Sequence, residues 1–207
     1  MADSQKVLEI LKAMSLRIEQ EKDYLTELDQ PIGDSDHGIN MARGFAAVEQ
    51  KLPTLVGKDI GTILKSVGMT LVSTVGGASG PLYGTAFMKA GTACAGKTEL
   101  NMADFLSALV AAVAGVQARG HAEPEEATMI DAMIPAVKAM KFAAAEGASN
   151  RAALDAGAAA ALAGAEHTKG LIATKGRACY VGERGIGHQD PGATSFTFLL
   201  ETIAEAF

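Results

Sequence analysis

Apolar side chains along the chain recur at helical spacing. Over residues 4–28 they lie mostly three or four positions apart, which is the spacing of one buried stripe on a helix. These apolar positions are Val7, Leu8, Leu11, Met14, Ile18, Leu25 and Leu28. The pattern predicts a first helix from Ser4 to about Leu28.

Gly, Pro, Asn and Asp residues divide the rest of the chain into further segments with the same spacing. No stretch is a convincing strand. The further predicted helices cover 38–51, 59–75, 80–94, 101–118, 128–145, 150–173 and 192–206. With the first helix this makes about eight, and the sequence predicts an all-α fold.

The segment 150–173 is rich in Ala and Gly, which is compatible either with low complexity or with a helix packed closely against its neighbours. Apolar side chains at Leu154, Leu162, Leu171 and Ile172 favour the packed helix.

Length and composition favour a single domain. It has 207 residues, of which 48% are hydrophobic and 20% charged, enough for one sizeable core but not for two comfortable domains. Aromatic residues make up only 5% and there is no Trp, which favours helix over strand. We therefore expect a single helical domain over residues 1–207.

Charge and cysteine content argue against several classes of function. The net charge is -6 and no Lys/Arg cluster is present, so we expect no nucleic-acid partner. The start M-A-D-S-Q-K does not resemble a secretory signal, and the run 156–165 is too short to span a bilayer, so we expect a cytoplasmic protein without membrane contact. Cys94 and Cys179 lie outside any C-x-x-C pattern, which argues against a disulfide or a zinc site.

The stretch L-D-Q-P-I-G-D-S-D-H-G-I-N-M, residues 28–41, concentrates carboxylates. Asp34 and Asp36 are two positions apart and can point to one side, while Asp29 can reach the same point after the P-I-G turn. Carboxylate oxygens are ligands for Mg²⁺, Mn²⁺ or Ca²⁺ rather than zinc. The spacing therefore indicates a site for a hard cation.

This stretch has two other interpretations. An EF-hand is excluded because Ile39 and Phe45 stand where Gly and Glu are required. Asp34 or Asp36 could instead cap the next helix, and the spacing alone supports capping and metal binding equally. Asn40, in the first turn of that helix, favours a site because Asn has little merit as a helix former, although Asn40 taken alone is compatible with either interpretation.

A glycine loop, V-G-G-A-S-G-P-L-Y-G at 75–84, precedes a predicted helix. Its backbone N–H groups and the helix N-terminus suit phosphate, although a tight interhelical turn explains the glycines equally well. No Lys follows, so it is not a Walker A loop. The unusually long connection 174–190 has the length of a functional loop, and its Arg177 could cover phosphates or a base. Together these features suggest a magnesium nucleotide.

Three motifs in order resemble those of a known family. They are L-D-x-x-I-G-D-x-D-H-G-x-N-M, G-M-T-L-x-S-x-V-G-G-A-S-G-P-L-x-G and G-R-A-x-Y-x-G-E-R-x-I-G-H-Q-D-P-G-A-T-S. The chain resembles the nucleotide-binding L subunits (DhaL type) of dihydroxyacetone kinases over essentially its whole length. The resemblance implies an eight-helix antiparallel up-and-down barrel that binds ADP or ATP through two Mg²⁺ ions.

The resemblance also assigns residues to roles. Asp29, Asp34 and Asp36 match the family's magnesium ligands. The positions that match nucleotide contacts are His37, Gly38, Ile39, Asn40, Ala78, Ser79, Gly120, Met129, Arg177, Asp190, Pro191 and Gly192. The one visible departure is Ser35, where Gly or Ala is common. No catalytic base is evident in the chain, so we assign no catalytic residue.

As function, the resemblance implies transfer of a phosphoryl group to dihydroxyacetone, or to a related short ketose, held on a separate K subunit that supplies the acid and base groups. A phosphotransferase-system M subunit is the expected source that recharges ADP, although ATP exchange remains open. The alternative is a regulatory protein whose nucleotide state controls a transcription factor. We also expect a homodimer.

Overall fold

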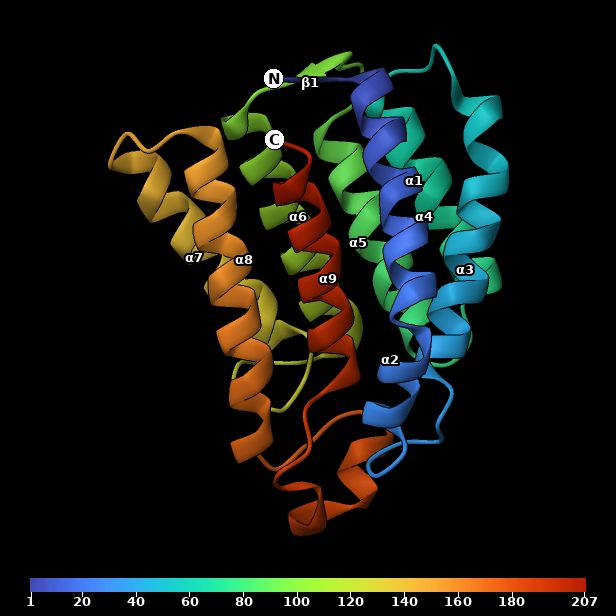
Figure 1. Cartoon of the computed structure of the whole chain (residues 1–207), viewed down its shortest axis with the longest axis vertical. Helices are drawn as coiled ribbons and strands as arrows, with labels where there is room; N and C mark the ends of the chain where they lie inside the picture. Colours follow the sequence, from blue (N-terminus) through green and yellow to red (C-terminus); the bar gives the residue numbers. More distant parts are fainter.

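The computed structural model describes residues 1–207 and is almost entirely helical (Figure 1). The α-helices are α1 (Ser4–Gln20), α2 (Lys22–Asp29), α3 (His37–Lys51), α4 (Ile60–Thr74), α5 (Ser79–Ala93), α6 (Met102–Gly120), α7 (Ile130–Ala145), α8 (Asn150–His167) and α9 (Pro191–Glu205). Short 3-10 helices are η1 (Leu52–Leu55), η2 (Thr168–Gly170), η3 (Arg177–Tyr180) and η4 (Gly182–Gly185).

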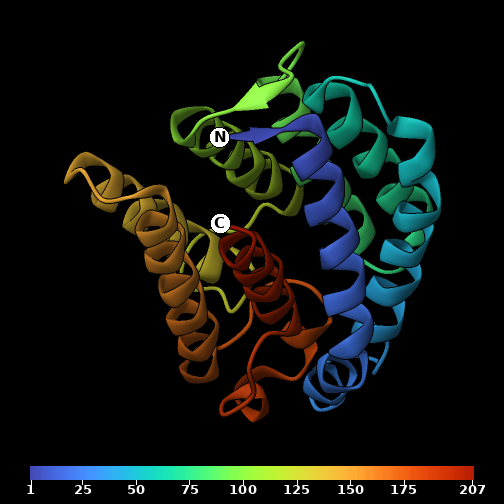
Figure 2. The same ribbon diagram turned by 45° about the horizontal axis from the view of Figure 1, so that its top comes forward.

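The long helices form a closed barrel. From α3 onward each helix packs against the next in sequence, α1 packs against α3, and α9 returns to pack against α1, which closes the ring (Figure 2). Because α2 continues the wall begun by α1, nine helical segments make eight walls. The predicted all-α, eight-helix antiparallel barrel is confirmed. The alternation of direction brings the N-termini of α3, α5, α7 and α9 to one end of the molecule, the lower end in Figure 1.

Three details differ from the sequence prediction. The first helix is interrupted at Glu21, in the only gap of its apolar stripe wider than four residues, between Ile18 and Leu25. The last long helix before the 174–190 loop ends at His167 rather than 173, because the chain tightens into η2.

The expectation of no strand was also wrong in a small way. Strand β1 (Ala2–Asp3) pairs antiparallel with β2 (Glu99–Leu100). This two-residue ladder lies at the end of the barrel opposite the N-termini of α3 and α9, and alternation cannot be recognised over two residues (Figure 1).

Small residues let neighbouring walls approach closely. On α8, Ala161 and Ala165 are fully buried, and Gly164 lies against the backbone of Asp131 on α7. On α4, a Cβ at Gly68 would lie only 2.6 Å from the carbonyl oxygen of Gly84 on α5. The Ala- and Gly-rich segment is therefore a packed helix, as predicted, rather than a low-complexity run.

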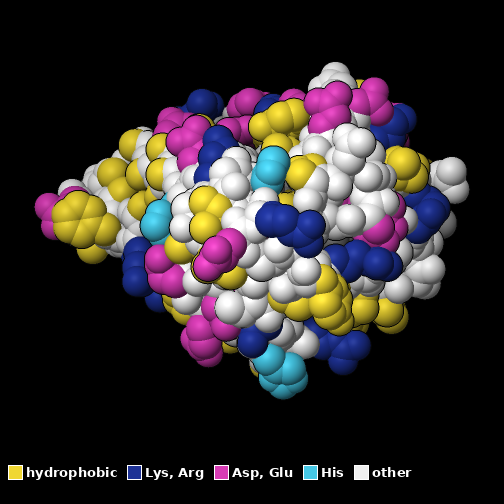
Figure 3. Space-filling model, turned by 90° about the horizontal axis from the view of Figure 1, so that it is seen from below, with side chains coloured by type: hydrophobic (Ala, Val, Ile, Leu, Met, Phe, Trp, Pro, Cys, Tyr) yellow, Lys and Arg dark blue, Asp and Glu magenta, His cyan; other side chains and the backbone are white.

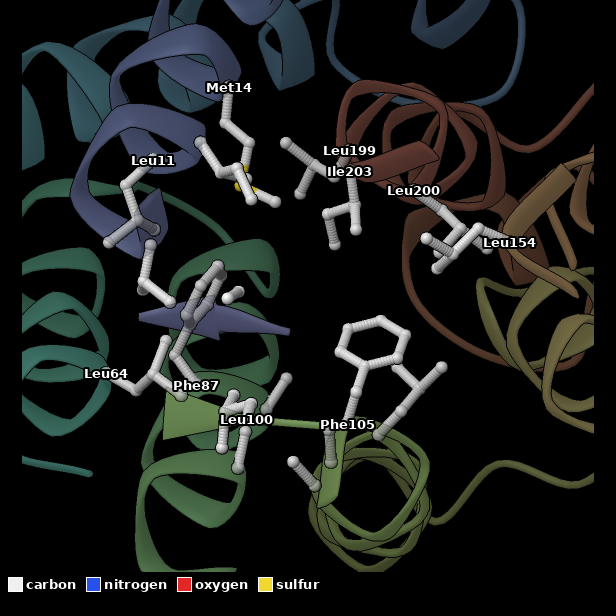
Figure 4. A pocket seen from close by; sticks show the side chains of 18 of the residues that line it. Leu11, Met14, Leu64, Phe87, Leu100, Phe105, Leu154, Leu199, Leu200 and Ile203 are labelled. Carbon is white, nitrogen blue, oxygen red and sulfur yellow. The ribbon is translucent and has the colours of Figure 1, made fainter. Parts of the chain in front are cut away.

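An apolar pocket of about 190 Å³, partly open to solvent, lies inside the barrel (Figure 4). Of its 28 lining residues 26 are hydrophobic, so it offers no ligands for a metal or a phosphate. Helix α6 is the one helix long and apolar enough to cross a membrane by length and composition, and its Phe105, Ala108 and Leu109 line this cavity. Tyr83 also lines the cavity while its hydroxyl points to polar groups, so it separates the apolar interior from the end described next.

Candidate functional site

The predicted site residues gather at the end of the barrel where α3, α5, α7 and α9 begin. Figure 3 shows this end, where acidic, basic and apolar side chains are interspersed and no single charge dominates. An anion bound here must therefore be held by local groups rather than by a broad basic surface.

The three aspartates form a compact cluster. One ligand oxygen from each of Asp29, Asp34 and Asp36 lies within 4.8 Å of the others. Asp29 is buried, Asp36 is half-buried and Asp34 is exposed, so the cluster opens to solvent on one side. This donor set and spacing fit a hard cation.

Helix α3 is capped by Asp29 and not, as the sequence suggested, by Asp34 or Asp36. The Oδ2 atom of Asp29 accepts hydrogen bonds from the backbone N–H groups of Asp36 (2.9 Å) and His37 (3.2 Å). Asp36 is the N-cap residue, yet its side chain makes no capping hydrogen bond. The capping explanation for Asp34 and Asp36 is therefore wrong, and neither carboxylate is used to cap the helix.

The turn that presents these aspartates has a strained residue. Ser35 adopts a φ of 61°, in the left-handed region that favours glycine. Ser35 is also the position where the sequence departs from the resembling family, in which Gly or Ala is common.

Arg177 reaches the cluster from the long loop. Its Nη2 lies 2.8 Å from Oδ2 of Asp34, although Arg177 remains largely exposed. The loop 174–190, which contains η3 and η4, thus lies next to the carboxylates and not merely between two helices. The guanidinium places a positive charge beside the most exposed aspartate.

The glycine loop contacts α3 through Asn40. A Cβ at Gly76 would lie 2.7 Å from Oδ1 of Asn40, and that oxygen also accepts a 2.6 Å hydrogen bond from Arg43. Arg43 in turn donates to the carbonyl of Thr74. Asn40 is buried because it braces this loop, while Ala78 remains exposed immediately before α5 begins at Ser79.

His37 lies between two hydroxyl groups. Its Nδ1 is 3.1 Å from Ser79 Oγ and its Nε2 is 2.9 Å from Ser195 Oγ, which is 2.7 Å from Tyr83 Oη. Burial lowers the pKa of His37 to about 4, against the opposing effect of the charges on Asp29 and Asp36. The imidazole is therefore neutral at pH 7.

Ser195 and Tyr83 were missed by the sequence analysis. Tyr83 follows Ser79 by one helical turn, which places both on one face of α5. No local signal indicates that Ser195, 158 positions after His37, would meet it.

Asp190 begins α9 and closes the site from the other side. Its carboxylate caps the helix by accepting a 2.6 Å hydrogen bond from the N–H of Ala193, and Pro191 takes the first helical position. The pKa of Asp190 is raised to about 7: burial is the main cause, the backbone hydrogen bonds from Ala193 and Gly192 oppose it, and the charges of Asp131 and Asp29 add to it.

The remaining predicted contacts are distributed around this end. Met129 is buried before α7, and a Cβ at Gly192 would lie 3.6 Å from its Cβ. Gly120 ends α6, where its nearest side chain is Leu82. Gly38 is packed against Thr26 of α2, whereas Ile39 points its side chain largely to solvent. The structure gives Gly38 a packing role and does not bring Gly120 against the carboxylates.

Comparison with known proteins identifies the family of this chain. Residues 31–205 match the family described as DAK2 domain. The chain is 47% identical to the ADP-binding subunit DhaL of the PEP-dependent dihydroxyacetone kinase of Escherichia coli, over 90% of this chain and 89% of that protein. It is 40% identical to the ADP-binding subunit DhaL of the PTS-dependent dihydroxyacetone kinase of Lactococcus lactis, over 96% and 95% of the two chains.

A solved structure shares the fold. The dihydroxyacetone kinase from C. freundii, crystallised in complex with AMP-PNP and Mg²⁺, matches with a TM-score of 0.76 and 26% identity, over all of this chain and 34% of that one.

Fold and site together define a helical-barrel protein of the dihydroxyacetone kinase class, with a carboxylate cluster and a glycine loop at one end of the barrel. The chain belongs to the DAK2-domain family and, within it, to the DhaL-type subunits.

Proposed function

We propose that this chain is the ADP- or ATP-binding subunit of a dihydroxyacetone kinase and acts as one nucleotide-binding domain. It transfers a phosphoryl group to dihydroxyacetone, or to a related short ketose, held on a separate K subunit. The observation that carries this proposal is the cluster of Asp29, Asp34 and Asp36, whose oxygens converge within 4.8 Å beside the glycine loop.

The aspartates would hold two Mg²⁺ ions. A bound Mg²⁺ would supply positive charge that offsets the charge of the phosphates. Asp29 is oriented for this task because its Oδ2 is fixed by two backbone N–H groups, while its Oδ1 accepts no hydrogen bond. Asp34 and Asp36 supply the solvent-facing oxygens.

The glycine loop and the start of α5 would bind the phosphates. The loop has no lysine, so backbone N–H groups and the positive end of the α5 dipole supply the favourable interactions. Gly120, Met129 and the start of α9 would surround the base, and Arg177 would cover the nucleotide. The chain thereby contributes positioning and charge neutralisation rather than acid-base chemistry.

A partner must supply the acceptor. His37 is buried and its two ring nitrogens already face hydroxyl groups, so it is poorly placed to receive a ketose. The loop that contains Arg177 also exposes Tyr180 (85%) and Ile186 (49%), and such a mixture of aromatic, aliphatic and Arg side chains suits a protein interface. This supports docking of a K subunit over the site.

Asp36→Asn tests the metal role. The substitution keeps the size of the side chain but removes the charge, so we expect the affinity for Mg-ADP to fall at least about 10-fold while the helix content stays the same. Isothermal titration with ADP in Mg²⁺ and in EDTA measures it. Asp23→Asn, on the exposed side of α2, is the matched control. Equal affinities of the two variants for Mg-ADP would show that Asp36 does not hold the metal.

Several finer properties stay proposals. An M subunit of the phosphotransferase system would recharge bound ADP, and native mass spectrometry showing ADP with two Mg²⁺ on the purified chain would support that mode over ATP exchange. The homodimer can be tested by sedimentation, and the cytoplasmic location by fractionation. A chain that binds nucleotide but adds nothing to a K subunit would fit the regulatory alternative.

A further inference from the structure

A continuous line of hydrogen bonds runs from the protein core to the glycine loop. Tyr83 Oη, Ser195 Oγ and the His37 ring follow one another at 2.7 and 2.9 Å, and Ser79 Oγ lies 3.1 Å beyond the ring. Tyr83 is 2% exposed and Ser195 fully buried, whereas Ser79 is half-buried at the start of α5. One end of the line is therefore sealed and the other faces the site.

The hydrogen bonds along this line can all point outward, toward Ser79, or all point inward, toward Tyr83. Each hydroxyl carries one proton and a neutral imidazole carries one on a single nitrogen. In the outward direction Tyr83 donates to Ser195, Ser195 donates to Nε2 of His37, and Nδ1–H donates to Ser79. In the inward direction Ser79 donates to Nδ1, and Nε2–H donates to Ser195.

In both directions the hydroxyl groups of Tyr83 and Ser195, at the buried end, have hydrogen-bond partners. The carbonyl oxygen of Gly192 lies 3.1 Å from Ser195 Oγ and 3.2 Å from Tyr83 Oη, so it can accept the proton of either hydroxyl when the line runs inward. The directions differ at the open end. Outward, Ser79 has its O–H free to donate; inward, Ser79 presents only lone pairs.

We propose that Tyr83 and Ser195 are positioning residues that set this line outward in the nucleotide complex, so that Ser79 donates its hydroxyl proton to a phosphate oxygen. This inference rests on the proposed function. An anionic oxygen at the glycine loop needs a donor, and the lone pairs of an inward-directed Ser79 would repel it. His37 then carries its proton on Nδ1, and its charge does not change.

Each positioning residue has a distinct part. Ser195 supplies the proton that makes Nε2 an acceptor. Tyr83 donates its hydroxyl proton to Ser195 Oγ and so favours the orientation in which Ser195 donates to His37. Without the Tyr83 hydroxyl, Ser195 can donate to the carbonyl oxygen of Gly192 instead. Serine and tyrosine thus act through the ring on Ser79, without touching the nucleotide.

The state of the His37 ring is a direct readout. Replacing the exposed His121, His167 and His188 by Gln leaves one imidazole, whose ¹⁵N and attached-proton signals identify the protonated nitrogen in the Mg-ADP complex. The inference predicts Nδ1–H with unprotonated Nε2. Nε2–H in that complex would overturn it.

Substitution provides the second readout. Ser195→Ala should raise the Kd for Mg-ADP about 10-fold, the usual scale for a hydrogen bond to a charged group, and Tyr83→Phe should raise it by a smaller factor. Thr197→Val, buried on the same helix, and Tyr24→Phe are matched controls that should leave the Kd unchanged. If Ser195→Ala disturbs the circular-dichroism spectrum, the gentler Tyr83→Phe decides.

The possible results distinguish failure of the positioning role from failure of the proposed nucleotide binding. If the parent chain fails to bind Mg-ADP, both fall. If it binds Mg-ADP but His37 carries Nε2–H, or if both substitutions leave the Kd unchanged, the positioning role alone is overturned and the nucleotide function stands.

Discussion

At the scale of single residues, the carboxylate cluster depends on how one turn is built. Asp29 uses one carboxylate oxygen to cap α3 and keeps the other free of hydrogen bonds, while the strained Ser35 lies between Asp34 and Asp36. Strain of this kind persists where the surroundings hold a residue in place, and it is common at binding sites. The chain therefore accepts a local cost to bring carboxylates together.

Ser35→Gly should relieve that cost. A serine in the left-handed region is less stable than glycine by about 1–2 kcal/mol, and the greater freedom of glycine in the unfolded chain offsets part of the gain. We expect the free energy of unfolding to rise by about 0.5 kcal/mol, measured in urea. Ser35→Ala keeps the Cβ and should give no increase; equal values for the two variants would show that φ is not the cause.

Asp190→Asn tests the raised pKa of the α9 cap. An acid whose folded pKa exceeds its unfolded value binds its proton more readily when folded, so its favourable contribution is complete below about pH 4 and is lost as the pH rises to about 7. Asn keeps the capping oxygen without the charge. In EDTA, the fall in unfolding free energy from pH 5 to pH 8 should therefore be smaller in the variant, by about 1 kcal/mol or more. An equal fall in both proteins would contradict the shift.

Residues close in sequence were predictable, and residues joined across the fold were not. The spacing of Asp34 and Asp36 indicated a cation site because two-residue separation fixes their relation locally. Ser195 lies 158 positions from His37, and only the closure of α9 against the rest of the barrel brings them together. A single sequence contains no local record of such a contact.

At the scale of elements, the loop 174–190 brings an exposed arginine to the carboxylate cluster. Its two short 3-10 helices place Arg177 against Asp34, and this exposed ion pair is worth little to the stability of the fold. Its effect should instead appear in how long a bound nucleotide is retained.

Arg177→Ala should speed nucleotide release more than it slows capture. Because exposed ion pairs contribute about 0.2–1 kcal/mol, we expect the off-rate to rise about 2- to 5-fold with stability nearly unchanged. Stopped-flow displacement of a fluorescent nucleotide measures both rates. Arg184→Ala, in the same loop but without an ion pair in this structure, is the control, and an unaltered off-rate for Arg177→Ala would show that the loop only connects two helices.

Helix boundaries were predictable to within about two residues where punctuation was clear. The breaks at Glu21 and after His167 were not predictable, because the spacing of apolar residues can continue across a point where the helix itself is interrupted. Both breaks lie in walls that lead to the site end, where α2 delivers Asp29 and η2 contributes Thr168, whose hydroxyl accepts from the N–H of Asp190.

At the scale of the whole molecule, topology divides the barrel into two regions. Antiparallel order collects four helix N-termini at the site end, while the pocket inside the barrel is apolar. The positive ends of these dipoles favour anions there, despite a net charge of -6. The fold is thus compatible with a polyphosphate ligand on an acidic protein, and under the proposed function a partner holds the acceptor.

The most direct test of the central claim is a coupled assay that follows dihydroxyacetone phosphate. We expect no product above background from this chain with Mg-ATP and dihydroxyacetone, because we assign it neither an acceptor site nor a general base. A general base alone typically raises the rate of the chemical step by about 10²–10⁴-fold. Product should form when a matching K subunit is added, with either Mg-ATP or a phosphotransferase-system M subunit as donor, and Asp36→Asn should abolish it. Turnover by the isolated chain, or no turnover with the K subunit and either donor, would contradict the account.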